Sequence, residues 1–157
     1  MKLADIICFE ATIMSFQSGE RDSVIRELVQ SLSDQGKLGK VGVDKITQAV
    51  IKRENEASTG IGKGVAIPHV KIAGINASVA AIGSSSEGLD FKSLDKKPVY
   101  TVILLVSPEK DPDSHLRAME LIFRNLNRDD FRRFLRQAES MDDVREAVLD
   151  ADIDSNG

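Results

Sequence analysis

The chain has 157 residues, of which 41% are hydrophobic, and its formal net charge of −4 provides no basic excess for binding a nucleic-acid backbone. A chain of this length and apolar content suits one domain with a single core. We therefore expect one domain over residues 1–157, in which the acidic residues 150–157 form a frayed tail.

Membrane insertion and metal chemistry are also disfavoured. The longest nearly continuous apolar run, Val99–Val106, is much shorter than the ~20 residues of a membrane helix, and the N-terminus lacks the apolar length of a signal peptide. The single cysteine, Cys8, excludes an internal disulfide, and the two histidines lack the spacing of a zinc site. We expect a cytoplasmic protein that needs no metal or other cofactor.

The first third of the chain predicts one strand followed by two helices. Weak alternation of apolar residues predicts a strand over Glu10–Met14. Apolar residues then recur along one helical face from Glu20 to Ser33, and Gly36 is the expected stop. A second helix is expected to begin after Asp44 as its N-cap, with Arg53 in its last turn.

The stretch Thr59–Lys71 stands out because glycines occupy alternate positions in its first half, at Gly60, Gly62 and Gly64. Glycine adopts positive φ at little cost and lets a backbone approach an anion or a partner closely. The spacing fits neither the dinucleotide fingerprint nor a P-loop. We expect a functional loop that uses neither nucleotide motif.

His69 follows a stiff stem. The short apolar run Val65–Ile67 predicts an extended segment, and Pro68 fixes the backbone immediately before the histidine. On physical grounds alone, a histidine in this setting is more often a packed or surface side chain than a reactive one. Arg53 could reach an anion held on His69, or it could simply complement the C-terminus of its helix.

The second half predicts two strands and three helices. Ala77–Gly83 and Pro98–Val106 are expected to be strands, the second deeply buried, with a turn at Ser84–Gly88 between them. The three helices are expected to begin near His115, capped by Asp113 or Ser114, at Asp129 or Asp130, and at Ser140.

Apolar spacing in these helices indicates which faces should be buried. The residues expected to point inward are Leu116, Met119, Ile122, Phe123 and Leu126 in the first helix, Phe131, Phe134 and Leu135 in the second, and Val144, Ala147 and Val148 in the third. The order of elements is not the regular alternation of a doubly wound fold. It predicts an α+β domain with a mixed sheet.

The segments Arg53–Glu54, Ser58–Gly62 and Gly64–His69 together closely resemble the active-site signature of a known family, the type-2 enzyme IIA domains of the bacterial phosphoenolpyruvate-dependent phosphotransferase system. This is the fructose, mannitol and nitrogen-regulatory class. Gly88–Phe91 and the later Pro98–Val99 resemble a further part of that family. The resemblance extends over nearly all of the chain. It implies a three-layer α/β/α sandwich with helices on both faces of the sheet.

The resemblance also implies roles for particular residues. The histidine of Ile-Pro-His carries the phosphoryl group in that family, which makes His69 the phosphorylated residue and places His115 beside it. Phosphoryl transfer needs alignment and stabilisation of the charge on the phosphoryl oxygens. The candidates for holding these oxygens are Arg53, His115, the hydroxyl groups of Ser58 and Thr59, and the N–H groups of the loop that contains Gly60, Gly62 and Gly64.

By the same resemblance, the protein is a phosphotransferase component. It would take phosphate from the histidine-containing phosphocarrier protein and pass it to an enzyme IIB partner, in sugar uptake or in nitrogen-type regulation. An alternative is a regulatory binding module whose choice of partner depends on phosphorylation of His69, with little onward transfer. The lack of an attached IIB or membrane segment slightly favours regulation. Val70 departs from the small residue that commonly follows the family's histidine and is expected to narrow access for a partner.

Overall fold

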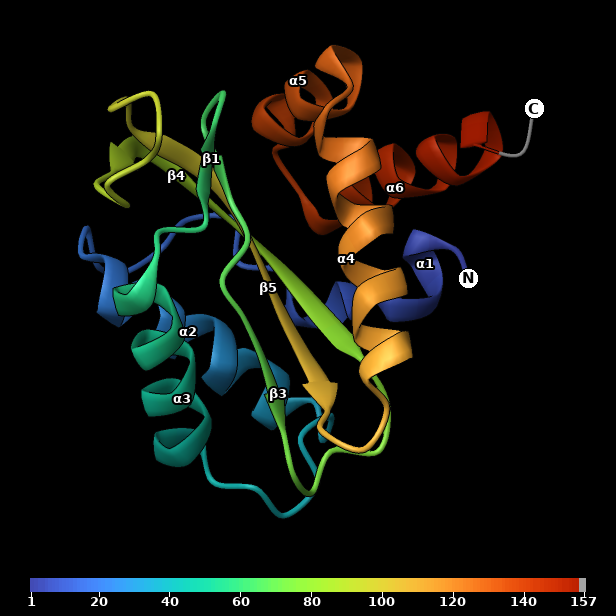
Figure 1. Cartoon of the computed structure of the whole chain (residues 1–157). Helices are drawn as coiled ribbons and strands as arrows, with labels where there is room; N and C mark the ends of the chain where they lie inside the picture. Colours follow the sequence, from blue (N-terminus) through green and yellow to red (C-terminus); the bar gives the residue numbers. More distant parts are fainter. Residues whose placement is uncertain (156–157) are drawn as a thin grey trace.

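A computed structural model describes residues 1–155 and shows a mixed sheet between two layers of helices (Figure 1). This arrangement confirms the expected α/β/α sandwich. The elements in chain order are α1 (Leu3–Ile6), the 3-10 helix η1 (Phe9–Ala11), α2 (Arg21–Asp34), α3 (Val43–Glu56), β1 (Gly60–Gly62), β2 (Val65–Ala66), β3 (His69–Ile72), β4 (Val79–Leu89), β5 (Val99–Pro108), α4 (Pro112–Leu126), α5 (Asp129–Gln137) and α6 (Met141–Ser155).

Strand β5 is the centre of the sheet. Strand β4 pairs with it in the antiparallel direction along one edge, while β2 and β3 both pair with it in parallel along the other. Pro68, between β2 and β3, has no N–H to donate to β5, so the parallel ladder is interrupted there. The interruption places His69 at the start of β3, opposite Leu105 near the middle of β5.

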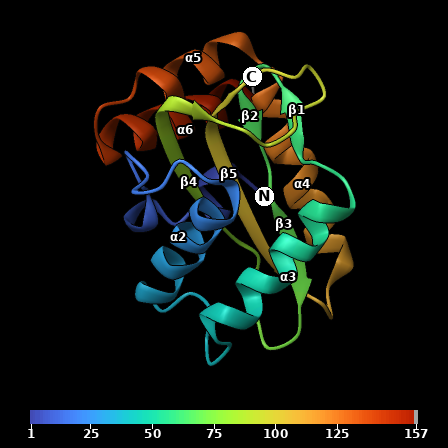
Figure 2. The same cartoon turned by 90° about the vertical axis from the view of Figure 1, so that its left-hand side faces the viewer.

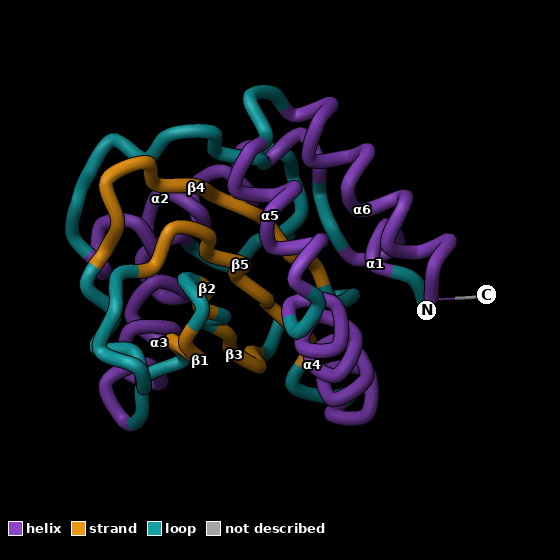
Figure 3. The backbone as a smooth tube through the Cα atoms, turned by 90° about the horizontal axis from the view of Figure 1, so that it is seen from above, coloured by secondary structure: helices purple, strands orange, loops and turns teal. Residues whose placement is uncertain are grey.

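The two faces of the sheet are covered by different helices. Helices α2 and α3 lie on one face, whereas α1, α4, α5 and α6 lie on the other, as Figures 2 and 3 show from two directions. Side chains of β5 alternate between the two cores, with Leu104 in the first and Ile103 and Leu105 in the second. Burial on both faces explains why β5 is apolar almost throughout.

One predicted strand and one predicted turn were wrong. The segment predicted as the strand Glu10–Met14 begins inside η1, and Ile13 makes only an isolated bridge to Gly83, because the 3-10 turn takes up the residues before that bridge. The turn predicted at Ser84–Gly88 is part of the long strand β4. A shift of register between Ser84 and Leu89 lets β4 remain paired with β5 despite its serine-rich composition.

Two helix starts also differ from the prediction. Helix α3 has Gly42 as its N-cap, while Asp44 lies inside its first turn and pairs with Arg26 at 2.5 Å. The N-cap of α4 is Asp111, which accepts a hydrogen bond from the backbone of Ser114 at 3.1 Å. Pro112 fits the first helical position because its fixed φ suits a helix and its missing N–H is not needed there. Asp113 and Ser114 are therefore inside α4.

The expected helix faces are mostly correct, with two exceptions. Ile122 and Leu135 are buried as predicted, but Leu116 is 59% exposed and Phe134 is 45% exposed. In α4 the buried face begins at His115, so the neighbouring Leu116 points away from it.

The expectation of a frayed tail was wrong for the described residues. Helix α6 continues to Ser155, and Asp152 within it is buried. The Asp152 carboxylate accepts hydrogen bonds from the backbone N–H groups of Leu3 at 2.8 Å and Ala4 at 3.0 Å. It thereby satisfies free donors at the start of α1 and joins the two ends of the fold. The last two residues, 156–157, lie outside the described part.

Candidate functional site

The ring of His69 is held by the backbone that leads to it. Its Nδ1 lies 2.8 Å from the carbonyl oxygen of Ile67, and the ring is partly buried. The carbonyl of Pro68 accepts from the N–H of Leu105 in β5, so the interruption in the ladder leaves the Ile67 carbonyl for the imidazole. Because a carbonyl can only accept, Nδ1 carries the ring proton and Nε2 keeps its lone pair.

His115 lies beside His69, with 5.5 Å between the ring centroids and 44° between the ring planes. It is buried in the first turn of α4, and its Nδ1 is 2.8 Å from the hydroxyl oxygen of Ser107. Ser78 donates to that same oxygen at 3.0 Å, which leaves the Ser107 proton available to His115. In this arrangement the ring proton of neutral His115 resides on Nε2.

Both histidines are held in the neutral state. Burial is the main cause that lowers the pKa of His69, although the hydrogen bond to Ile67 opposes it. Burial is the main cause that lowers the pKa of His115 to about 4, and repulsion from a protonated His69 and from Lys71 contributes further. Near neutral pH, the pair therefore offers one acceptor nitrogen on His69 and one N–H donor on His115.

Arg53 makes the contact expected of a residue that complements a helix C-terminus. Its guanidinium donates to the carbonyl of Ala57 at 3.0 Å, beyond the end of α3, so it complements the helix C-terminus. Its positive charge also contributes to the lowered pKa of His69.

Glu54 was not singled out by the sequence analysis. Its carboxylate is buried and accepts hydrogen bonds from both the backbone N–H and the hydroxyl group of Thr59, each at 2.6 Å. The carbonyl of Thr59 in turn accepts from the N–H of Ile67 at 3.2 Å. These bonds connect the end of α3 to Ile67, two residues before His69. The available signal was position, because Glu54 continues the buried face of Ile46 and Val50 at intervals of four residues.

The hydroxyl of Ser58 is also used within this segment. It donates to the carbonyl of Phe91 at 2.5 Å and accepts from the N–H of Gly60 at 3.0 Å. The protons of both candidate hydroxyls, on Ser58 and Thr59, are thus engaged by protein acceptors. In this structure the two residues shape the connection between α3 and β1.

The glycines form a β-hairpin away from His69. Gly62 has φ +94° and Gly64 has φ +80°, which reverses the chain between β1 and β2. Val65 pairs with Thr101 on β5, whereas His69 pairs with Leu105 four residues further along, which corresponds to about 13 Å. The structure therefore does not bring Gly62 and Gly64 to the imidazole pair.

Gly60 has a different reason to be glycine. A Cβ atom added to it would lie 2.3 Å from the hydroxyl oxygen of Ser93. Such a contact is far shorter than any normal van der Waals distance, so the close approach of the backbone to Ser93 requires a residue without a side chain.

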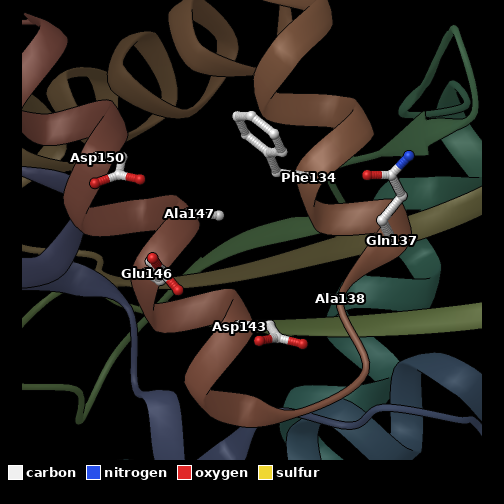
Figure 4. Close-up of a pocket in the computed structure, with 7 residues that line it drawn as sticks. All are labelled: Phe134, Gln137, Ala138, Asp143, Glu146, Ala147 and Asp150. Carbon is white, nitrogen blue, oxygen red and sulfur yellow. The ribbon is translucent and has the colours of Figure 1, made fainter.

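A separate cavity of about 370 Å³ lies between α5 and α6 (Figure 4). Phe134 of α5 lines it together with three carboxylates of α6, those of Asp143, Glu146 and Asp150. Such a lining repels a phosphate. Over residues 1–155 there is no group of three or more His, Cys, Asp or Glu placed to hold a metal ion. None of the helices in that range is long and apolar enough to cross a membrane.

Comparison with known proteins gives a consistent family. The family model for the "Phosphoenolpyruvate-dependent sugar phosphotransferase system, EIIA 2" matches residues 8–151. The chain is 34% identical over 148 residues to the fructose-specific EIIABC component of Bacillus subtilis, covering 94% of this chain but only 23% of that protein. It is 27% identical over 150 residues to a nitrogen regulatory protein of Pseudomonas aeruginosa, covering 96% of each chain.

Solved structures have the same fold. The nitrogen regulatory protein IIA-Ntr from Neisseria meningitidis superposes with a TM-score of 0.84 at 24% identity, covering 93% of this chain and 98% of that one. The mannitol enzyme IIA of Escherichia coli, solved in complex with phosphorylated enzyme IIB, gives a TM-score of 0.74 at 17% identity, covering 90% and 95%. These likenesses confirm the three-layer architecture.

Proposed function

We propose that this chain, which belongs to the type-2 enzyme IIA family of the phosphoenolpyruvate-dependent phosphotransferase system, accepts a phosphoryl group on Nε2 of His69. The observation that carries the proposal is the 2.8 Å contact between His69 Nδ1 and the Ile67 carbonyl. It fixes the tautomer and the ring orientation, and it leaves Nε2 as the nucleophile. The lowered pKa keeps that nitrogen unprotonated near neutral pH, so no separate base is required.

The transfer step needs one bond to form and one to break. The lone pair of His69 Nε2 attacks phosphorus, and the P–N bond to the donor's imidazole breaks with its electron pair returning to the donor. We propose the histidine-containing phosphocarrier protein as the donor and an enzyme IIB protein as the next acceptor. Support for the second partner comes from the mannitol relative, whose structure was solved with phosphorylated enzyme IIB.

We propose that two side chains stabilise the transferred group. Nε2–H of His115 is the donor that the hydrogen bond at Nδ1 leaves free, and the guanidinium of Arg53 supplies a permanent charge. A phosphoryl dianion on His69 should also favour the protonated form of His115. We therefore expect the pKa of His115 to rise from about 4 when His69 is phosphorylated, which NMR titration of both forms would measure.

The proposal is tested by incubating the protein with phosphoenolpyruvate, enzyme I and the phosphocarrier protein. We expect one phosphoryl group that is labile in acid and stable in alkali, and its NMR signature should place it on Nε2. The variant His69→Ala should take up none, while His115→Ala should still be labelled. Equal labelling of His69→Ala and the wild type, or a phosphoryl group on Nδ1, would contradict the assignment.

A second candidate function is a regulatory module whose partners respond to phosphorylation of His69. The observation that favours it is the similarity to a nitrogen regulatory protein over 96% of both chains. Mixing the phosphorylated protein with purified enzyme IIB domains distinguishes the two functions. Rapid loss of the phosphoryl group to a IIB domain supports the relay, whereas retention together with phosphorylation-dependent capture of another protein supports the module.

A further inference from the structure

A second cavity, of about 270 Å³, lies between the β1–β2 hairpin, the start of β5 and helix α5. Figure 1 shows the hairpin and α5 next to each other at the top of the molecule. Its polar lining comes mainly from Lys63, Tyr100, Thr101, Arg132, Arg133 and Arg136. Thr101 in this cavity pairs with Val65, whereas His69 pairs with Leu105. The two β5 residues are about 13 Å apart along the strand.

The lining is strongly cationic. Asp129 also lines the cavity, but its carboxylate is paired with Arg132. Lys63, Arg133 and Arg136 form no side-chain ion pair with any residue of the described range. A further carboxylate nearby is that of Asp95, which accepts the backbone N–H of Lys63 at 3.1 Å, so the lining keeps a positive excess. This excess occurs on a protein whose overall charge is −4. Neighbouring cations repel one another, and an anionic ligand would relieve that repulsion.

Thr101 adds a neutral hydrogen-bond donor to the lining. The residue is 3% exposed and lines the cavity, where its hydroxyl can donate to a bound ligand. An anionic oxygen in the cavity would accept the hydroxyl proton.

The arrangement of Arg136 adds a constraint. Its guanidinium carbon lies 3.7 Å above the centre of the Tyr100 ring, which holds the planar group at the edge of the cavity. An arginine fixed in this way can present two N–H groups to one oxyanion. This pair of N–H groups matches the closely spaced oxygens of a phosphate better than it matches a diffuse negative surface.

We propose that this cavity binds a small phosphate monoester, with the phosphate held by Lys63, Arg133, Arg136 and the hydroxyl of Thr101. The volume of about 270 Å³ accommodates a phosphate with a compact organic body and is too small for a folded partner. Binding is reversible and forms no covalent bond. The proposal is independent of the phosphoryl relay, since it uses neither His69 nor His115.

The test is an NMR titration of the full-length ¹⁵N-labelled protein with inorganic phosphate, with glucose 6-phosphate, and with glucose as the uncharged control. We expect saturable shifts at the amides of Gly64, Thr101 and α5 with both phosphates, and none with glucose. Thr101→Val removes the hydroxyl and keeps the shape, and it should weaken binding about tenfold. Arg133→Gln should weaken binding similarly, and Lys63→Gln is a second charge variant if another variant fails to fold.

Two controls locate the ligand. Arg124→Gln changes an exposed arginine of α4 that is not among the lining residues, and it should bind phosphate as the wild type does. His69→Ala should also bind normally. The proposal is overturned if glucose produces the same shifts, if Arg124→Gln weakens binding as much as Arg133→Gln does, or if His69→Ala abolishes binding.

Discussion

The histidine site and the cationic cavity lie along the same strand, β5, but they would treat a phosphate in opposite ways. At the site, the pKa values of both His69 and His115 are lowered, so the ring pair is neutral, and the charges that act on it come from Arg53, Glu54 and Lys71. The cavity is lined by the cationic side chains of Lys63, Arg133 and Arg136 and by the hydroxyl of Thr101. A relay must give up its phosphoryl group, so tight holding of that group would slow the onward step. Neutral donors therefore suit transfer, whereas permanent charge suits retention.

The largest effect should come from removing the neutral donor. We expect His115→Ala to slow phosphoryl acceptance by roughly 10²-fold, because loss of one preorganised donor has an effect of that size. The variant should still be labelled at His69 and should hold its phosphohistidine less stably. Initial labelling rates measure the effect, with Leu116→Ala as the matched neighbour, since Leu116 is exposed. Wild-type rates for His115→Ala would remove His115 from the transfer site.

A smaller loss is expected at Arg53. Arg53→Ala should slow transfer by about tenfold at every pH in the working range, because the guanidinium remains charged throughout and a charge-assisted hydrogen bond contributes about 1.5–3 kcal/mol. Lys52→Ala is the control, since Lys52 is an exposed cation one residue away in α3. If transfer by Arg53→Ala declines only at one end of the pH range, the role of Arg53 is indirect.

The lowered pKa of His115 should also make the free energy of unfolding depend on pH. The folded-state pKa of His115 is about 4 against an ordinary 6.5, so the unfolded chain binds more protons between these values. The stabilising contribution is complete above pH 6.5 and is lost as the pH falls toward 4. The slope is at most about 1.4 kcal/mol per pH unit for each such proton. Denaturant titrations at several pH values should show a shallower dependence for His115→Gln than for the wild type.

The smallest effect on transfer is expected from the hairpin. Gly62 has φ +94°, so Gly62→Ala should lower the free energy of unfolding by about 1 kcal/mol or more. It should weaken phosphate binding in the adjoining cavity and leave labelling of His69 nearly unchanged, because the hairpin turn is far from the imidazoles. Thermal melting, NMR titration and labelling of one preparation test this together. A strong loss of labelling with unchanged melting would place the turn in the transfer site.

The local sequence was sufficient to predict the features that depend only on neighbouring residues in the chain. The apolar run Pro98–Val106 predicted the buried central strand, and the Ile-Pro-His motif was central to the resemblance that the family match confirms. The positive φ of Gly62 and Gly64 was also within reach, because glycine adopts it readily. The separation of these glycines from His69 could not be predicted from the local sequence, because the parallel register of β2 and β3 on β5 sets that distance.

The residues that the sequence analysis missed act through tertiary contacts. Glu54 and Ser107 are polar, and their burial depends on segments far away in the chain, so composition alone gave no reason to select them. The same is true of Asp152, whose acidic surroundings indicated fraying although its carboxylate accepts N–H groups from α1. Exposure of Leu116 and Phe134 reflects how each helix is rotated against the sheet, which the apolar spacing defines only to within about one residue.

The bonds from Leu3 and Ala4 to Asp152 have a consequence for how this domain is tethered. They bring the beginning of α1 and the end of α6 to one corner of the molecule, where Figure 3 shows these two helices on the same side. A neighbouring domain would therefore be attached at that corner whether it preceded or followed this one. Fusions in either order should present His69 to the neighbour over a similar distance, and a circular permutant reopened at the exposed turn around Gly74 should keep the same fold.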